Sequence, residues 1–257
     1  RESIVRGDEV SGLSGAYQAL DRAVLERREP FNRAFAASLA DWTAAWSAGG
    51  VLGVEDVLSQ VVARVAGAGN RVLLIVLDGM SWAVCHELLD DLRQEHWSLK
   101  TLDESSTPPR PVIAAVPSVT SRSRASLLSG KLVVGDAAVE RRNFESDPHL
   151  KACCDRKHPP TLFHKKEVTD GPRGAVGDEL SGVVLSPAHR VVGVVLNAVD
   201  DRLSGAQQIR DDWSIDRIGP LGTLLKLARD SGRVVVLASD HGHVWHRSEA
   251  RAAPLET

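Results

Sequence analysis

The sequence has few cysteines, no long apolar run and little net charge, and each of these absences argues against a class of protein. Cys85, Cys153 and Cys154 are too few and too unevenly spaced for a disulfide framework. No apolar run approaches the roughly 20 residues that span a bilayer, and no secretory signal peptide is visible. The formal net charge of -3 argues against a dedicated nucleic-acid coat. We therefore expect a globular protein that works in the reducing cytoplasm, away from membranes.

The sequence also lacks a glycine-rich loop of the kind that cradles nucleotide phosphates. The segment LDGMS, which follows the strongest strand pattern, contains neither a GxGxxG motif nor a P-loop. This lack argues against a nucleotide-binding sheet without hydrolysis. The six tryptophans do not interleave with basic residues, so we expect them in the core and at interfaces rather than as base-stacking platforms.

The N-terminal part of the chain is rich in residues that favour helices. Apolar residues recur at helical spacing between about 17 and 48, and a second helix is expected from about Val54 to Val65. Residues 1–70 are therefore predicted to form a helical lead-in. The chain begins with Arg1 and stops soon after a strand pattern, so we expect it to be an excerpt of a longer protein.

The remainder, residues 71–257, has the alternating texture of an α/β protein. The apolar run from Val72 to Leu77 is typical of a strand buried on both faces. The stretch 131–189 is rich in Pro, Gly, His and charge, and we expect an irregular insertion there. Strands alternating with helices predict a mostly parallel open sheet with helices on both faces. The other expected elements are helices at about 81–92, 121–128 and 215–229, and strands at about 112–117, 190–201 and 232–242.

Acidic residues follow the three strongest strand candidates. Asp78, Asp200 and Asp240 stand at strand ends, and His241 comes directly after the last of them. The carboxyl ends of parallel strands meet at one edge of a sheet, where ligands bind. Gathered carboxylates repel one another unless a cation neutralises them, and His beside Asp suits zinc, with magnesium or manganese as alternatives. Each acid by itself could merely cap the next turn, but their joint occurrence favours a metal site.

A hydroxyl nucleophile is available just before the helix expected at 121–128. Thr120 is the candidate there, and Ser118 and Ser121 are its competitors. A helix N-terminus stabilises an alkoxide and a phosphate anion, and Arg122 and Arg124 add positive charge that could contact substrate phosphate. The alternative is that Thr120 is only a helix cap and that the arginines form a solvated face.

A second cluster of potential metal ligands lies in the sequence HLKACCDRKH. His149, Cys153, Cys154 and His158 could hold a structural zinc ion. Adjacent cysteines rarely both bind one ion, and the spacing matches no common zinc finger. A reduced loop is therefore the favoured interpretation.

The order of these motifs resembles that of the alkaline phosphatase superfamily. LDGMS, the T-x9-G spacing in TSRSRASLLSG, an Asp-bearing strand end and SDHG follow one another as they do there. Within this superfamily the chain is most similar to the PglZ domain of BREX and phage growth limitation systems, particularly its type 2 form. The resemblance runs from about Arg71 to the end, through VLLIVLDGMSW, PSVTSRSRASLLSG, the LFHKK segment and VVVLASDHGHVWHR. It implies an alkaline-phosphatase-like core, incomplete in this chain.

The resemblance also implies roles for the site residues. Thr120 would be the nucleophile, and one metal would be held by Asp78, Asp240 and His241. A second metal would use Asp200, with Asp201 as the alternative. The superfamily places a further His ligand downstream, for which His243 and His246 are the candidates here.

Two functions follow from this resemblance. The first is a metal-dependent phosphoesterase of bacterial anti-phage defence, acting on a phosphate mono- or diester such as DNA or a nucleotide, beside other BREX or phage growth limitation proteins. The superfamily usually places a His a few residues after the Asp of the second metal, but Asp200 is followed by Asp201, Arg202, Leu203 and Ser204. The second function is therefore a metal-binding scaffold subunit of a BREX-type complex that does no catalysis.

Overall fold

The computed structural model describes residues 11–45, 51–102, 111–169, 176–197, 199 and 213–243. None of the helices in these ranges combines the length and the apolar character needed to cross a membrane. In chain order the elements are α2 (Ser11–Ala45), β1 (Leu52–Gly53), the 3-10 turn η1 (Val54–Asp56), the π-helical η2 (Leu58–Val62), α3 (Ala63–Gly67), β2 (Val72–Leu77), α4 (Trp82–Gln94), β3 (Val112–Ile113), α5 (Thr120–Ser129), α6 (Ala137–Ser146), α7 (Pro148–Ala152), β4 (Thr161–Phe163), α8 (Lys165–Val168), α9 (Asp178–Leu185), β5 (Val191–Leu196), the 3-10 turn η4 (Ile215–Arg217), α11 (Leu221–Asp230) and β6 (Val234–Ala238).

The main sheet is a four-stranded parallel sheet in the order β4-β5-β2-β6. Val72 at the start of β2 pairs with Val191 of β5 on one side and with Val234 of β6 on the other. The ends of β5, β2 and β6 therefore meet at one edge of the sheet. The predicted α/β fold, with a parallel sheet and an N-terminal helix ahead of it, is confirmed. A separate two-stranded sheet joins β1 to β3.

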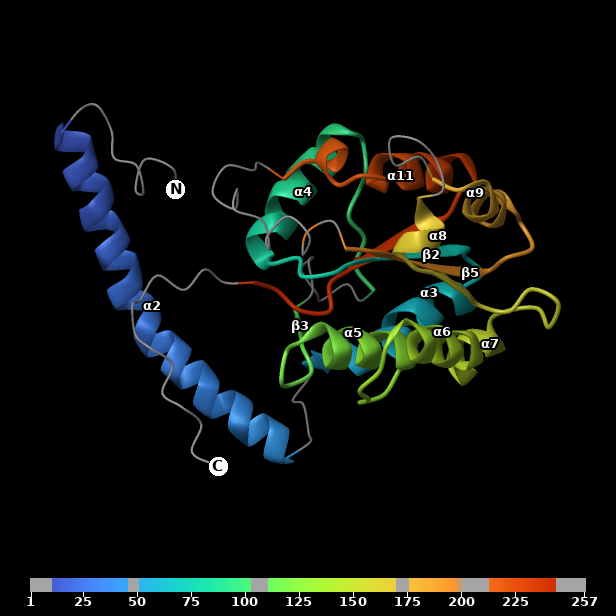
Figure 1. Ribbon diagram of the computed structural model, residues 1–257, viewed down its shortest axis with the longest axis horizontal. Coiled ribbons are helices and arrows are strands. Elements are labelled where there is room, and N and C mark those ends of the chain that lie inside the picture. Colours follow the sequence, from blue (N-terminus) through green and yellow to red (C-terminus); the bar gives the residue numbers. More distant parts are fainter. Residues whose placement is uncertain are drawn as a thin grey trace.

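The side chains of β2 alternate between two hydrophobic cores, one on each face of the sheet. Leu73 packs in the core that contains Leu88 of α4 and Leu224 of α11, whereas Leu74 packs in the core that contains Phe144 of α6. Figure 1 shows α4, α9 and α11 on one side of the sheet and α3, α5, α6 and α7 on the other. A parallel strand covered on both faces must be apolar throughout, which explains the unbroken run in the sequence.

The two halves of the predicted lead-in differ in burial. The segment from β1 to α3 packs into the second core through Val54, Leu58 and Val62. The long helix α2 is instead largely exposed, and Figure 1 shows it apart from the sheet. Its Phe31 and Phe35 side chains are 66% and 60% exposed. The division of the chain at residue 70 stays a prediction.

The expectation of little regular structure at 131–189 is wrong. This stretch supplies α6, α7, α8, α9 and the edge strand β4 of the main sheet. The polar residues that suggested a loop are in part helix caps, because Asp136 accepts hydrogen bonds from the first turn of α6 and Asp147 accepts one from Leu150 in α7. Capping residues and short helices look like loop sequence when they are counted by composition alone.

A buried arginine joins three segments at the N-terminal ends of the parallel strands, at the opposite end of the sheet from Asp78 and Asp240. Arg233, just before β6, donates to the backbone carbonyl oxygens of Val184, Ser186 and His189, between the end of α9 and β5. It also donates to the carbonyl of Val72 at the start of β2. Burial, together with the charge of Arg71, lowers the pKa of Arg233 to about 10. The residue remains charged at neutral pH and stabilises the C-terminus of α9.

We expect Arg233→Leu to lower the free energy of unfolding by at least about 2 kcal/mol, because several buried carbonyl groups would lose their hydrogen-bond donor. Urea unfolding followed by circular dichroism measures this change. The exposed Arg142 provides the control, and Arg142→Leu should change the free energy by no more than about 0.5 kcal/mol. Equal stability of the two variants would contradict the structural role of Arg233.

Candidate metal centre

Three predicted ligands come together where β2 and β6 end. Asp78 follows β2, and Asp240 and His241 follow β6, which pairs with β2. One ligand atom from each lies within 4.8 Å of those of the other two. The two carboxylates are each 1% exposed and His241 is 8% exposed. Neighbouring parallel strands thus bring together residues that are far apart in the sequence.

The turn after β2 holds this cluster in place. Gly79 has φ of 76°, a left-handed conformation that favours glycine. Its backbone N–H donates to Asp240 Oδ1 at 3.2 Å. On the other strand, the Ser239 hydroxyl donates to the carbonyl of Leu77 at 3.1 Å. These bonds tie the end of β6 to the end of β2, so the two carboxylates stay close.

Helix α5 brings the predicted nucleophile to the cluster. Thr120 is the first residue of α5, and its Oγ1 lies 3.0 Å from His241 Nε2 and 3.4 Å from Asp78 Oδ1. The helix ends at Ser129 and is followed by Gly130, whose φ of 61° forms a left-handed C-cap. The ten-residue spacing between Thr120 and Gly130 in the sequence motif is therefore the length of this helix.

A buried serine fixes the start of α5 against the end of β6. Ser123 Oγ donates to the backbone carbonyl of Asp240 and accepts a hydrogen bond from Ala115 N at 3.1 Å. Ser123 is fully buried. Ser123 could not be singled out from the sequence, because a serine between two arginines in a helix carries no distinctive signal.

The electrostatics of the cluster match a cation site. Burial and the nearby Asp78 carboxylate raise the pKa of Asp240 to about 7. Burial would also raise the pKa of Asp78, but the hydrogen bond with His241 and the charge of Arg124 outweigh it and leave the pKa lowered. Asp240 Oδ2 is buried and has no hydrogen-bond partner among the described residues, although His241 Nε2 lies 3.5 Å from it. Two carboxylates and an imidazole, with one oxygen left unsatisfied, fit a divalent cation such as zinc.

The second group of potential ligands does not gather. Among the described residues, Asp78, Asp240 and His241 are the one group of three whose ligand atoms lie close enough to hold a metal. Cys153 Sγ instead donates to the backbone carbonyl of Ala63 at 3.5 Å. The segment is not a loop throughout, because Pro148–Ala152 form α7, and Cys153 and Cys154 are free cysteines.

The two predicted phosphate-binding arginines differ in their surroundings. Arg124 Nη1 donates to Asp78 Oδ2 at 2.6 Å and its Nε donates to Glu140 Oε1 at 3.0 Å. Both interactions are with carboxylates, so this guanidinium already pairs with two anionic side chains of the protein and is the weaker candidate for binding a phosphate. Arg122 is half-buried, and its Nε has no hydrogen-bond partner among the described residues.

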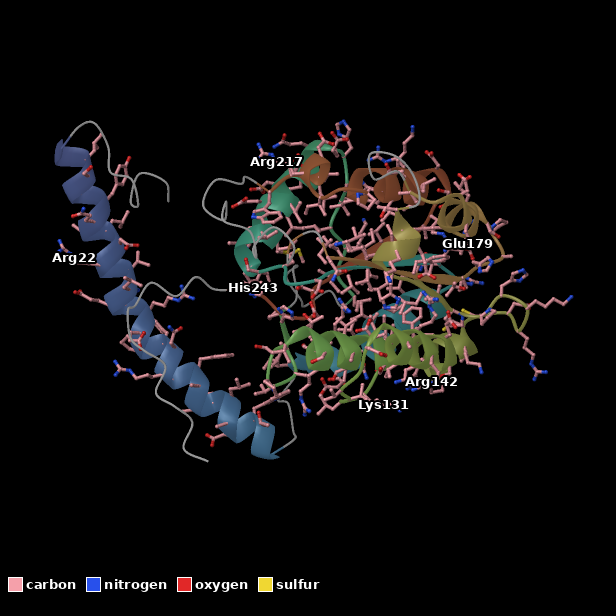
Figure 2. All side chains as sticks on the ribbon, viewed as in Figure 1. Arg22, Lys131, Arg142, Glu179, Arg217 and His243 are labelled. Atoms are coloured by element: carbon pink, nitrogen blue, oxygen red, sulfur yellow. The ribbon has the colours of Figure 1, made fainter. Side chains whose placement is uncertain are left out.

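The second metal site remains a prediction. Asp200, its alternative Asp201 and the downstream candidate His246 lie outside the described residues. His243 is exposed, and its ring packs edge-on against that of His241 at 5.2 Å between centroids. Figure 2 shows His243 beyond the end of β6, where the described part of the chain stops.

Two further polar residues at the site were missed in the sequence. Asn197 directly follows β5, and its Nδ2 donates to Asp78 Oδ2 at 2.9 Å. The rule that found the acidic strand ends applies equally to this amide, so Asn197 could have been found. Glu140 is fully buried beside Arg124, but it lies in the stretch read as irregular, where no pattern pointed to it.

We expect Zn²⁺ affinity to rise with pH up to about 7, because the Asp240 proton must leave before the carboxylate can bind a cation. Below that pKa the affinity should fall by about tenfold per pH unit for one competing proton. Isothermal titration calorimetry between about pH 6 and pH 8 measures this slope. Asp90→Asn, which removes an exposed carboxylate, should leave the slope unchanged. A flat profile would show that no ligand proton is displaced.

The comparison with protein families agrees with this geometry. The family model of the BREX system PglZ alkaline phosphatase-like domain matches residues 57–254. The matched range contains the strand ends, α5 and the three clustered ligands. A search of curated proteins found no match. Because the family model covers most of the chain, the protein belongs to the PglZ alkaline phosphatase-like domain family.

Proposed function

We propose that this chain is a metal-dependent phosphoesterase of bacterial anti-phage defence, with Thr120 as its nucleophile. The observation that carries the proposal is the position of Thr120 Oγ1, 3.0 Å from His241 Nε2 and 3.4 Å from Asp78 Oδ1. A hydroxyl at the start of a helix, beside a cluster of metal ligands, is arranged for nucleophilic attack on a phosphate ester. Membership of an alkaline phosphatase-like family supports the same reaction class.

Asp78, Asp240 and His241 would hold the cation, as their clustered ligand atoms suggest. A divalent cation bound there would neutralise negative charge on the phosphate and lower the pKa of the Thr120 hydroxyl. Zinc fits the donor set best, with magnesium or manganese as alternatives. Asp200 is proposed to serve a second cation, with His243 as an additional ligand.

Thr120 would attack the phosphorus in line with the ester bond. The Oγ1 proton is lost as the bond from Oγ1 to phosphorus forms, and the leaving ester oxygen takes up a proton. Water would later cleave the phosphothreonine and restore the hydroxyl, releasing phosphate from a monoester or a phosphomonoester from a diester. The N–H groups of Arg122 and Ser123 already donate to the carbonyl of Val119, so an anion at the start of α5 would be favoured by the helix dipole and by the N–H groups ahead of these two. Arg122, whose Nε has no partner among the described residues, is the better candidate to bind a phosphate oxygen. Arg124 is held by carboxylates.

The substrate is proposed to be a phosphate mono- or diester, with DNA or a nucleotide as the class that defence against phage suggests. Other BREX or phage growth limitation proteins are the proposed partners, and the cytoplasm is the proposed location. The scaffold hypothesis makes the opposite prediction for catalysis, because it retains metal binding without turnover.

We expect Thr120→Ala to lower hydrolysis of p-nitrophenyl phosphate esters by on the order of 10³-fold, because it removes the attacking oxygen. Zn²⁺ affinity should stay close to that of the wild type, since Thr120 is not one of the clustered ligands. Mono- and diester substrates are assayed in parallel. Ser121→Ala, the neighbouring hydroxyl, is the matched control and should retain turnover.

Asp240→Ala should instead abolish both metal binding and turnover, because it removes a ligand from the cluster. Wild-type turnover in Thr120→Ala would exclude Thr120 as the nucleophile. Tight Zn²⁺ binding by the wild type without hydrolysis of any ester would favour the scaffold.

A further inference from the structure

Behind the cluster of candidate metal ligands lies a largely buried chain of ionisable residues that the proposed reaction does not use directly. It consists of Arg124 in α5, Glu140 in α6 and His164 immediately before α8. We infer that this chain of three side chains positions Asp78 for metal binding, and this inference rests on the proposed function of the cluster. These are positioning residues, because they act through Asp78.

The two carboxylate oxygens of Asp78 face different groups. Oδ1 lies 3.4 Å from His241 Nε2 and 3.4 Å from Thr120 Oγ1, so it faces the cluster. Oδ2 accepts hydrogen bonds from Arg124 Nη1 at 2.6 Å and from Asn197 Nδ2 at 2.9 Å. With both donors on Oδ2, the carboxylate cannot rotate without losing a buried hydrogen bond, and Oδ1 remains directed at the cation position.

Arg124 is itself fixed from behind by Glu140. Arg124 Nε donates to Glu140 Oε1 at 3.0 Å, while its Nη1 reaches Asp78. The rigid, planar guanidinium therefore bridges two carboxylates, which the single ammonium of a lysine does poorly. Glu140 also balances the charge of Arg124, so that the arginine does not fully neutralise Asp78 and weaken it as a ligand.

His164 completes the chain at its far end. Its Nε2 lies 2.7 Å from Glu140 Oε2, and because a carboxylate only accepts hydrogen bonds, His164 donates from that nitrogen. The Glu140 side chain is fully buried, whereas those of His164 and Arg124 are 13% and 12% exposed. The loss of either partner would leave a buried carboxylate oxygen without its hydrogen bond, which is costly.

The segment that supplies two of these residues shows why the chain matters for the site. Glu140 and His164 come from the helices and the edge strand of 131–169, which contribute no ligand to the cluster. They are connected to Asp78 through Arg124, which bonds to both Glu140 and Asp78. Partners of this kind behind a metal ligand change metal affinity or activity by about 10–100-fold when they are mutated.

The test compares Zn²⁺ binding by the full chain and its Glu140→Gln variant, measured by calorimetry. This change keeps the size of the side chain and removes the charge that balances Arg124. We expect the Kd for Zn²⁺ to rise by about 10–100-fold, with kcat/KM for ester hydrolysis falling in parallel. Glu145→Gln, the same change on the same helix, is the matched control and should leave the Kd unchanged.

Two further variants keep the inference testable if Glu140→Gln does not fold, which thermal melting would reveal. Arg124→Lys keeps the charge but cannot bridge both carboxylates, so the Kd should rise although the net charge is unchanged. His164→Gln acts at the end of the chain that is farthest from Asp78 and should produce a smaller rise in the Kd.

The outcomes separate this inference from the proposed function. If the folded variants bind Zn²⁺ as tightly as the wild type, the positioning role is overturned whether or not the protein hydrolyses esters. If the Kd rises in the variants but the wild type hydrolyses no ester, the positioning role stands and the proposed phosphoesterase fails. A wild type that binds no divalent cation overturns both.

Discussion

The repulsion between two buried carboxylates is the interaction around which this structure is organised. Asp78 and Asp240 follow neighbouring strands and are almost completely buried. Like charges repel more strongly in the protein interior than in water. Asp78 is stabilised as an anion by Arg124, Asn197 and His241, but Asp240 has a raised pKa, and its Oδ2 has no hydrogen-bond partner within the part of the chain that the structure describes. A bound cation would relieve this cost, and the other features of the site are arranged around that position.

The strand order of the sheet explains why these residues meet. Because β2 lies between β5 and β6, the residues after these strands, Asp78, Asn197 and Asp240, converge at one edge. Covering both faces with helices makes the strands rigid and leaves the edge as the place for chemistry. Helix α5 adds Thr120 from one side, held there by Ser123, while α6 adds Glu140 behind it.

Much of the fold and part of the site could be predicted from sequence because their signals are local. The unbroken apolar strands predicted a parallel sheet, and acids at strand ends predicted the cluster of Asp78, Asp240 and His241. Glu140 could not be predicted, because its role depends on a partner 16 positions away, on another helix. The stretch that contains it was misread since caps and short helices share the composition of loops. The positions of Asp200 and Asp201 lie outside the described residues.

The sequence by itself determined the central strands β2, β5 and β6, the long N-terminal helix, the family resemblance and the candidate ligands, because these depend on residue type and near-neighbour spacing. Only the tertiary structure decided which charged groups interact with one another. It placed Arg124 between Asp78 and Glu140 rather than in solvent, and left Asp240 Oδ2 without a hydrogen-bond partner among the described residues. The physical reason is that hydrogen bonds and charge interactions depend on distance in space, and parallel strands and packed helices bring distant parts of the chain together.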